Sequence, residues 1–153
     1  MKNIARLAHL YLQKTAKEKY KAAGFLLISP KDKELFLVKR AQNVDSPGTW
    51  CTVGGGVEGN EDYLEAAKRE CLEELGSCPE ISDIIDDIDS SVKDDLIYKT
   101  FIAVVSPETR ASWKPKLNPE NDEFGWFKPN ELPKPLHPGL AYTLKLLKDK
   151  YAK

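Results

Sequence analysis

Apolar residues recur at helical spacing near both ends of the chain and form short continuous runs between them. Near the start, lysine and arginine separate the apolar positions, which predicts an amphipathic helix that ends near residue 20. Its apolar positions are Ile4, Leu7, Ala8 and Tyr11. Such a helix either packs on its own domain or forms the face of a homodimer. A second amphipathic pattern predicts a helix over residues 138–151, with Pro138 at its start and His137 as a turn residue.

The continuous apolar runs predict β-strands. Residues 22–29 and 34–40 are separated by the turn sequence Pro-Lys-Asp-Lys and predict a β-hairpin. Three later strands are predicted over residues 80–89, 96–105 and 123–129. Residues 106–122 are rich in Pro, Lys and Asn and predict a long loop, a kind of segment that is often functional or mobile.

The middle of the chain predicts two loops followed by a helix. Residues 43–50 and 52–59 have loop composition, and the second segment contains three consecutive glycines. Residues 61–75 predict a helix, for which Asn60 is a suitable N-cap and Gly76 the expected C-terminal stop. Helices and strands therefore alternate along the chain, which predicts a mixed α/β fold.

Length and charge narrow the class of protein. The chain has 153 residues, which fits a single domain over residues 1–153 with residues 1–20 as an N-terminal helical extension. The net charge of −1 argues against non-specific binding to nucleic acid or to a membrane surface, both of which attract basic proteins. The three cysteines form no CxxC pair, and the N-terminal segment is too charged for a signal peptide or membrane span. We therefore expect a cytoplasmic protein.

The helix predicted over residues 61–75 gathers glutamates on one side. At about 100° per residue, an apolar stripe faces the core and consists of Leu64, Ala67, Cys71 and Leu75. Glu70, Glu73 and Glu74 share another face, where like charges three or four residues apart destabilise a helix by about 0.2–0.5 kcal/mol each. A solvated acidic helix is the plain interpretation. The alternative is a site for a hard cation such as Mg²⁺ or Mn²⁺, which prefers oxygen ligands.

The glycines before this helix favour the second interpretation. Gly54, Gly55 and Gly56 let a ligand approach the backbone closely, whereas a tight turn needs only one glycine. A glycine-rich segment that leads into a helix also directs backbone groups toward phosphates or a metal ion.

The spacing of these residues resembles the Nudix box, Gly-x5-Glu-x7-Arg-Glu-U-x-Glu-Glu-x-Gly-U, where U is a bulky apolar residue. The chain matches it as Gly55, five residues, Glu61, seven residues, then Arg69-Glu70-Cys71-Leu72-Glu73-Glu74-Leu75-Gly76-Ser77. The departures involve no charged position: they are Val53 before the glycines, Cys71 at the first U and Ser77 at the last U. The resemblance extends beyond the box with less specific features. These are the predicted hairpin, Trp50 and the segment "FGWFKPNELP" at residues 124–133.

The resemblance implies an α/β/α sandwich around a mixed β-sheet. It also implies hydrolysis of a nucleoside diphosphate linked to another group, with Mg²⁺ or Mn²⁺ as cofactor. By the resemblance, Arg69 orients the helix carboxylates. Glu73, Glu74 and the carbonyl of Gly54 are metal ligands, and Glu70 either binds metal or takes the proton from water.

Further roles are implied less strongly by the same resemblance. Glu61 is structural, at the positive end of the helix. A further metal-binding carboxylate is expected before the Trp-containing strand, where the candidates are Glu120, Asp122 and Glu123, with Glu123 preferred.

Three residues are expected at the substrate. Arg40 and Lys39 end the second strand and are expected to bind phosphate, with a solvated strand end as the alternative. Trp113 lies in the long loop and is expected either to stack on a nucleobase or to belong to an exposed variable loop.

Three functions remain open at this point. The first is a nucleoside triphosphate pyrophosphohydrolase that releases a nucleoside monophosphate and pyrophosphate. The second is a hydrolase of ADP-ribose, a nucleotide sugar or a dinucleoside polyphosphate. The third is a Nudix-fold binding or regulatory module without catalysis, against which the intact glutamates argue. In each case the expected partner is a small nucleotide, with a homodimer possible and no nucleic acid or membrane involved.

Overall fold

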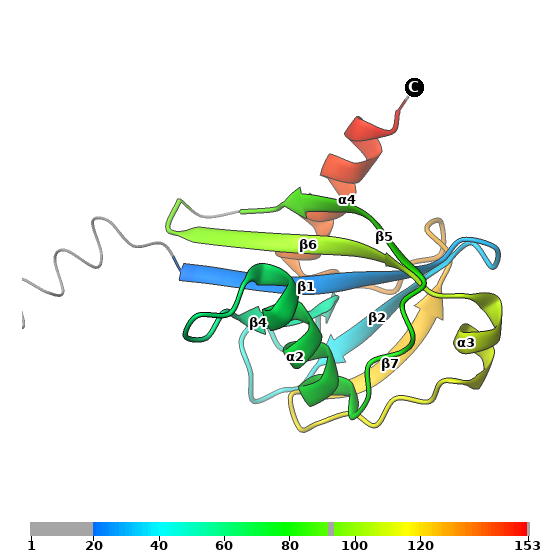
Figure 1. Ribbon diagram of the computed structural model, residues 1–153, viewed down its shortest axis with the longest axis horizontal. Coiled ribbons are helices and arrows are strands. Elements are labelled where there is room, and N and C mark those ends of the chain that lie inside the picture. Colours follow the sequence, from blue (N-terminus) through cyan, green and yellow to red (C-terminus); the bar gives the residue numbers. More distant parts are fainter. Residues whose placement is uncertain (1–19, 92–93, 153) are drawn as a thin grey trace, which may run out of the picture.

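The computed structural model describes residues 20–91 and 94–152 (Figure 1). The predicted N-terminal helix lies outside these residues. The described elements, in chain order, are β1 (Tyr20–Ser29), β2 (Glu34–Arg40), β3 (Trp50–Cys51), β4 (Val53–Gly56), α2 (Tyr63–Leu75), β5 (Asp83–Asp89), β6 (Leu96–Val104), α3 (Pro107–Ser112), β7 (Asn121–Phe127) and α4 (Pro138–Lys150).

The strands form one mixed sheet. Its order is β3-β2-β1-β6-β5, with β4 also paired to β1 and β7 to β2. The predicted hairpin is confirmed, because β1 and β2 are antiparallel with Ile28 opposite Leu35. β1 runs parallel to β6 along nearly its whole length, and this pairing makes the sheet mixed.

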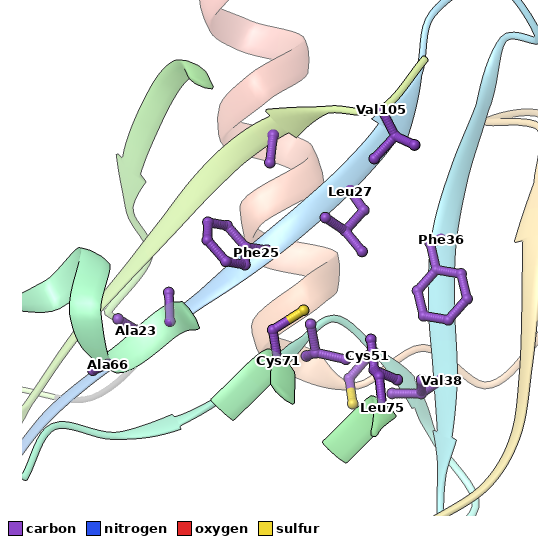
Figure 2. Close-up of a cluster of buried hydrophobic side chains, with 13 residues drawn as sticks. Ala23, Phe25, Leu27, Phe36, Val38, Cys51, Ala66, Cys71, Leu75 and Val105 are labelled. Atoms are coloured by element: carbon purple, nitrogen blue, oxygen red, sulfur yellow. The ribbon is translucent and has the colours of Figure 1, made fainter. Parts of the chain in front are cut away.

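Helices cover both faces of the sheet, as the α/β/α sandwich requires. Alternate residues of β1 point to opposite faces. Phe25 and Leu27 therefore join the apolar cluster under α2, which also contains Cys71 and is shown in Figure 2. Leu26 joins the second cluster, under α4. The expectation that Cys71 fills the core is confirmed, since its side chain is fully buried.

The segment predicted as a glycine loop is in part a strand. Gly54 and Gly55 pair antiparallel with Gly24 and Ala23 of β1. Only Thr52 separates β4 from β3, which pairs with β2. Residues 50–56 therefore bridge β1 and β2, a long-range pairing that local composition does not reveal.

Two other boundaries differ from the sequence prediction. The N-cap of α2 is Asp62 rather than Asn60, because Asp62 and Glu65 form a reciprocal capping box with each other's backbone. The long segment 106–122 contains a short helix, α3, with Ser106 as N-cap and Pro107 at its first turn. In the part of the chain that the structure describes, no helix is long and apolar enough to cross a membrane.

The end of the long segment is attached to α2. The backbone N–H of Lys116 donates to Leu75 O, and that of Asn118 donates to Glu74 O. The last carbonyls of α2 thus have partners, and residues 116–118 are fixed against the helix that carries the glutamates.

Candidate active site

Arg69 is the centre of the ion pairs on α2. Its Nε and one terminal nitrogen donate to both oxygens of Glu61, at 2.7 and 3.0 Å. The same terminal nitrogen donates to Gly56 O at 2.7 Å, and the other contacts Glu70 at 3.0 Å and Glu73 at 3.2 Å. Arg69 therefore links the start of α2, the glycine strand and two of the helix carboxylates.

Glu70 lies directly against the glycine strand. A Cβ built on Gly55 would be 2.5 Å from Cδ and Oε1 of Glu70, so a side chain at position 55 would displace this carboxylate. Burial raises the pKa of Glu70 above its usual range, despite the opposing effect of Arg69. The charges of Glu73 and Glu120 act in the same direction as burial.

Glu74 is buried and lacks a cationic partner. Only 4% of the residue is exposed, and its two oxygens accept from Gly54 N at 2.8 Å and from Asn121 Nδ2 at 3.0 Å. No ion pair within residues 20–91 and 94–152 includes it. Burial raises the pKa of Glu74 to about 7, and the charges of Glu70 and Glu120 contribute. A cation at this position would offset the cost of burying the carboxylate.

Glu73 and Glu74 differ more than the helical wheel suggests. The side chain of Glu73 is 53% exposed and faces Arg69, as the spacing of four residues predicts. Glu74 instead turns toward β4 and the start of β7, where Asn121 lies. Asn121 was not identified from the sequence, since nothing in its loop-like surroundings distinguishes it.

The three acidic residues at the start of β7 occupy different positions: Glu120 directly precedes the strand, and Asp122 and Glu123 belong to it. Glu123, preferred from the sequence, bonds Lys39 Nζ at 3.1 Å across the β2–β7 pair. Glu120 is the member of this group whose charge raises the pKa of both Glu70 and Glu74. Glu120 thus acts electrostatically on the helix carboxylates, whereas Glu123 pairs with Lys39, and the choice of Glu123 as a metal ligand stays a prediction. Asp122 is exposed.

The chemistry of these donors fits a divalent cation. Among the described residues no three His, Cys, Asp or Glu side chains are yet arranged as a metal-binding group. Glu70, Glu74 and Glu120 nevertheless combine hard oxygen atoms with mutual repulsion, and Glu74 has only neutral hydrogen-bond partners. Mg²⁺ and Mn²⁺ are the ions that prefer such oxygen ligands.

A cavity of about 380 Å³ lies between the sheet and α4. Gly54 and Gly55 line it, so the same strand borders both the cavity and the acidic residues of α2. The cavity's polar and titratable lining residues are Tyr20, Arg40, Asp45, Cys51, Thr52, Ser90, Tyr98, Thr100, His137 and Thr143. Its volume lies at the lower end of the range typical of small-molecule sites.

Gly54 separates Tyr98 from Glu74. The Tyr98 hydroxyl lies where a side chain of Gly54 would be, while the Gly54 N–H donates to Glu74. Burial raises the pKa of Tyr98 well above its usual range. This position of Tyr98 beside Gly54 was not predicted, because Tyr98 belongs to an apolar run that only indicates a strand.

The predicted substrate-binding residues separate into two groups. Arg40 lines the cavity, and its Nε donates to Asp45 O at 2.5 Å. Lys39 faces Glu123 and does not line the cavity.

Trp113 packs against Phe36 with a 5.2 Å ring separation, and its indole N–H donates to Ser77. Trp113 thus lies at the C-terminal end of α2, where it joins the core packing. His137, predicted as a turn residue, lines the cavity and is the N-cap of α4.

Comparisons with known proteins show which family and fold the chain resembles. A family model described as NUDIX domain matches residues 19–147. The "Nucleoside triphosphatase NudI" of Escherichia coli O17:K52:H18 is 36% identical over 98 residues, which are 56% of this chain and 66% of that protein. The protein of the same name from Salmonella newport is 34% identical over 96 residues, with the same coverage. The match therefore spans slightly less than two thirds of these relatives.

Solved structures share the fold. The MutT NUDIX hydrolase from Burkholderia pseudomallei has a TM-score of 0.64 at 24% identity, over 84% of this chain and 98% of that one. The Nudix hydrolase RenU from M. smegmatis has a TM-score of 0.70 at 24% identity, over 88% and 87% of the two chains. At this identity the similarity establishes the architecture alone.

Proposed function

Because the chain belongs to the Nudix hydrolase superfamily, we propose that this hydrolase converts nucleoside triphosphates to nucleoside monophosphates and pyrophosphate with Mg²⁺ or Mn²⁺. One observation carries the proposal: the helix carboxylates and a cavity for a small molecule lie on the two sides of β4. A nucleotide placed across this strand would reach the cavity with its nucleoside and the carboxylates with its phosphates. The nucleoside triphosphatase relatives support this choice of substrate.

The residues that would hold the metal come from α2, from the glycine strand β4 and from the loop before β7. Glu70, Glu73 and Glu74 of α2 are the proposed side-chain ligands, with the carbonyl of Gly54. We propose Glu120 as the additional carboxylate, since its charge acts on Glu70 and Glu74. When bound, the metal neutralises phosphate charge and lowers the pKa of a coordinated water.

The chain's own residues provide positioning and charge. Arg69 holds Glu70 and Glu73 relative to the glycine strand through its bond to Gly56 O. Gly54 N and Asn121 fix both oxygens of Glu74. Such fixed groups are the main contribution that a protein makes to phosphoryl transfer, where the chemistry requires little covalent participation. Glu70, with its raised pKa, is the proposed proton acceptor if it does not bind metal.

Arg40 is the proposed phosphate-binding cation of the cavity. It is the arginine in the cavity lining. An arginine at this position would contact the phosphates between the nucleoside and the metal. Lys39 is not included, because Glu123 already neutralises it.

A screen of substrates tests the proposal. We expect the purified protein with Mg²⁺ or Mn²⁺ to convert a nucleoside triphosphate to its monophosphate and pyrophosphate, and to lose this activity in excess chelator. ADP-ribose, nucleotide sugars and dinucleoside polyphosphates are the competing substrates. Release of single phosphate from the terminal position, or preference for a competing substrate, would refute the proposal. A homodimer, the absence of a nucleic-acid partner and a cytoplasmic location remain predictions.

A further inference from the structure

We propose that His137 is a specificity-determining residue that donates a hydrogen bond from its Nε2–H to a carbonyl oxygen of the nucleobase. This inference rests on the proposed function, because it assigns the cavity to the nucleoside. It concerns a residue outside the Nudix box, at the junction between the cavity and α4.

The capping role of His137 determines where its ring proton lies. The backbone N–H of Gly139 donates to His137 Nδ1 at 2.9 Å, so Nδ1 must present a lone pair. A neutral imidazole carries its single proton on the other nitrogen, and this tautomer is therefore Nε2–H. None of the hydrogen bonds found among residues 20–91 and 94–152 uses Nε2. Since the ring lines the cavity and Nδ1 is turned to Gly139, Nε2 is the nitrogen left for a ligand.

The backbone holds this donor in a fixed place. His137 N donates to Trp50 O at 2.8 Å, and Ala141 N donates to His137 O at 3.0 Å. His137 is thereby attached both to β3 and to the first turn of α4. Pro138, which has no N–H, restricts the backbone at the first helical position. A donor held in this way loses little conformational freedom when a ligand binds.

The surrounding charges indicate which acceptor His137 would meet. Burial and the neighbouring Arg40 both lower the pKa of His137, so the ring is a neutral donor at neutral pH. Arg40 supplies the positive charge that an anionic phosphate requires, and a neutral donor suits an uncharged acceptor. Thr143 on α4 already donates its hydroxyl proton to Gly139 O. Among the uncharged acceptors of a nucleotide, which also include ring nitrogens and ribose hydroxyls, we assign to this donor a base carbonyl, which uracil and guanine have and which an amino group replaces in adenine.

Three substitutions separate the donor from the cap. Asn, Asp and Ser all accept a hydrogen bond at a helix N-cap, so each preserves the bond to Gly139 N. His137→Asn also keeps an N–H donor, His137→Asp presents only acceptors, and His137→Ser is too short to reach the ligand. For UTP and GTP we expect KM of the Asp and Ser variants to rise about tenfold, the effect of one hydrogen bond. For His137→Asn, KM should stay within about threefold of wild type, with kcat and the thermal midpoint little changed in all three.

ATP is the control substrate. Its KM should change little in any variant, because its base lacks the carbonyl. A KM for UTP in the Asp and Ser variants equal to that of wild type would mean that His137 is only a helix cap, and would overturn the proposal. A fall in kcat with unchanged KM would do the same.

Two measurements keep this inference separate from the proposed function. If the wild-type protein hydrolyses no nucleoside triphosphate, calorimetric binding of UMP, GMP and AMP to the same variants still tests His137. The chain has two histidines, so a His9→Gln protein gives a single imidazole in a ¹H–¹⁵N spectrum. We expect the proton on Nε2 and none on Nδ1. A protonated Nδ1 at neutral pH, or binding of UMP by the Asp and Ser variants as tight as by the wild-type protein, would overturn the proposal.

Discussion

The carboxylate of Glu70 occupies the space that a side chain on Gly55 would fill, with only 2.5 Å between the would-be Cβ and the Glu70 carboxyl carbon. The glycine at position 55 is thus required by a neighbour and not by its own backbone dihedral angles. The position of Glu70 depends on the absence of a single methyl group.

Gly55→Ala should therefore impair catalysis more than folding. The Glu70 carboxylate is the flexible end of its side chain and would move aside, which limits the cost in stability. The displacement should lower kcat by about one to two orders of magnitude, because catalytic groups tolerate little misplacement. Steady-state kinetics and thermal unfolding measure the two effects.

Gly59→Ala is the matched control for this substitution. Gly59 has a φ of +53° and no atom within 4 Å of a built Cβ, so an alanine there would be strained without touching the site. It should cost about 1 kcal/mol of stability and leave kcat nearly unchanged. The same kcat in both variants would contradict the role assigned to Gly55.

Glu73→Gln and Glu74→Gln should each lower activity by orders of magnitude, because both remove an anionic oxygen from the proposed metal site. Without metal, Glu74→Gln should keep or raise the thermal midpoint, since a neutral side chain suits its buried position better than a carboxylate. Kinetics and thermal unfolding in chelator measure these outcomes.

Glu65→Gln provides the control on the same helix. Glutamine at this position keeps the capping box with Asp62, so both stability and activity should remain near wild type. If all three variants showed small and similar effects, α2 would be an acidic surface helix with no part in catalysis.

Substitutions of Glu120 and Glu123 test which of the two carboxylates binds the metal. Glu120→Gln should raise the metal concentration required for half-maximal activity by about tenfold, because it removes one negative charge near Glu70 and Glu74. Glu123→Gln loses an exposed ion pair with Lys39 and should change stability by less than about 1 kcal/mol. Metal titrations of activity decide between them, and the reverse order would restore Glu123 as the additional carboxylate.

The contribution of His137 to stability should fall as pH drops below 6.5. The pKa of His137 in the folded chain lies below its ordinary value of 6.5, with Arg40 beside it and Asp45 also in the cavity wall. In this range the unfolded chain binds a proton at His137 that the folded chain does not, so this contribution to the free energy of unfolding decreases with decreasing pH. Glu74, whose pKa is raised to about 7 in the folded chain, acts in the opposite direction, so the effect of His137 is read as a difference from a variant. Protonation also removes the Nδ1 acceptor of the cap, which is worth about 1 kcal/mol.

Denaturant unfolding between pH 5 and pH 7.5 measures this dependence. His137→Asn keeps a cap that does not titrate, so the free energy of unfolding of the wild-type protein should fall relative to that of this variant as the pH decreases. An identical slope in the two proteins would show that His137 titrates with the same pKa in both states.

The box residues could be predicted from the sequence because their spacing alone determines their neighbours on α2. The apolar stripe that includes Cys71 and the bond between Arg69 and Glu73 both follow from helical geometry, and the structure has both. Helical spacing could not predict that Glu74 is buried while Glu73 is exposed. Their burial depends on β4 and on Asn121, which pairing far along the chain brings to the helix.

The cavity could not be predicted for the same reason. Its wall combines residues of several strands with the start of α4, and the sequence indicates each of them only as part of a strand, loop or turn. Gly54 is an example. The sequence shows that it has no side chain, but its position between Tyr98 and Glu74 results from the pairing of β1 with β4 and β6.

The strand β4 divides the molecule into two regions that can change independently. The carboxylates proposed to bind metal come from α2 on one side, whereas Tyr98 belongs to β6 and His137 to the start of α4 on the other. Substitutions on the second side would alter which ligand fits without moving α2. For protein engineering, the residues that line the cavity could thus be randomised while α2 and its carboxylates are kept.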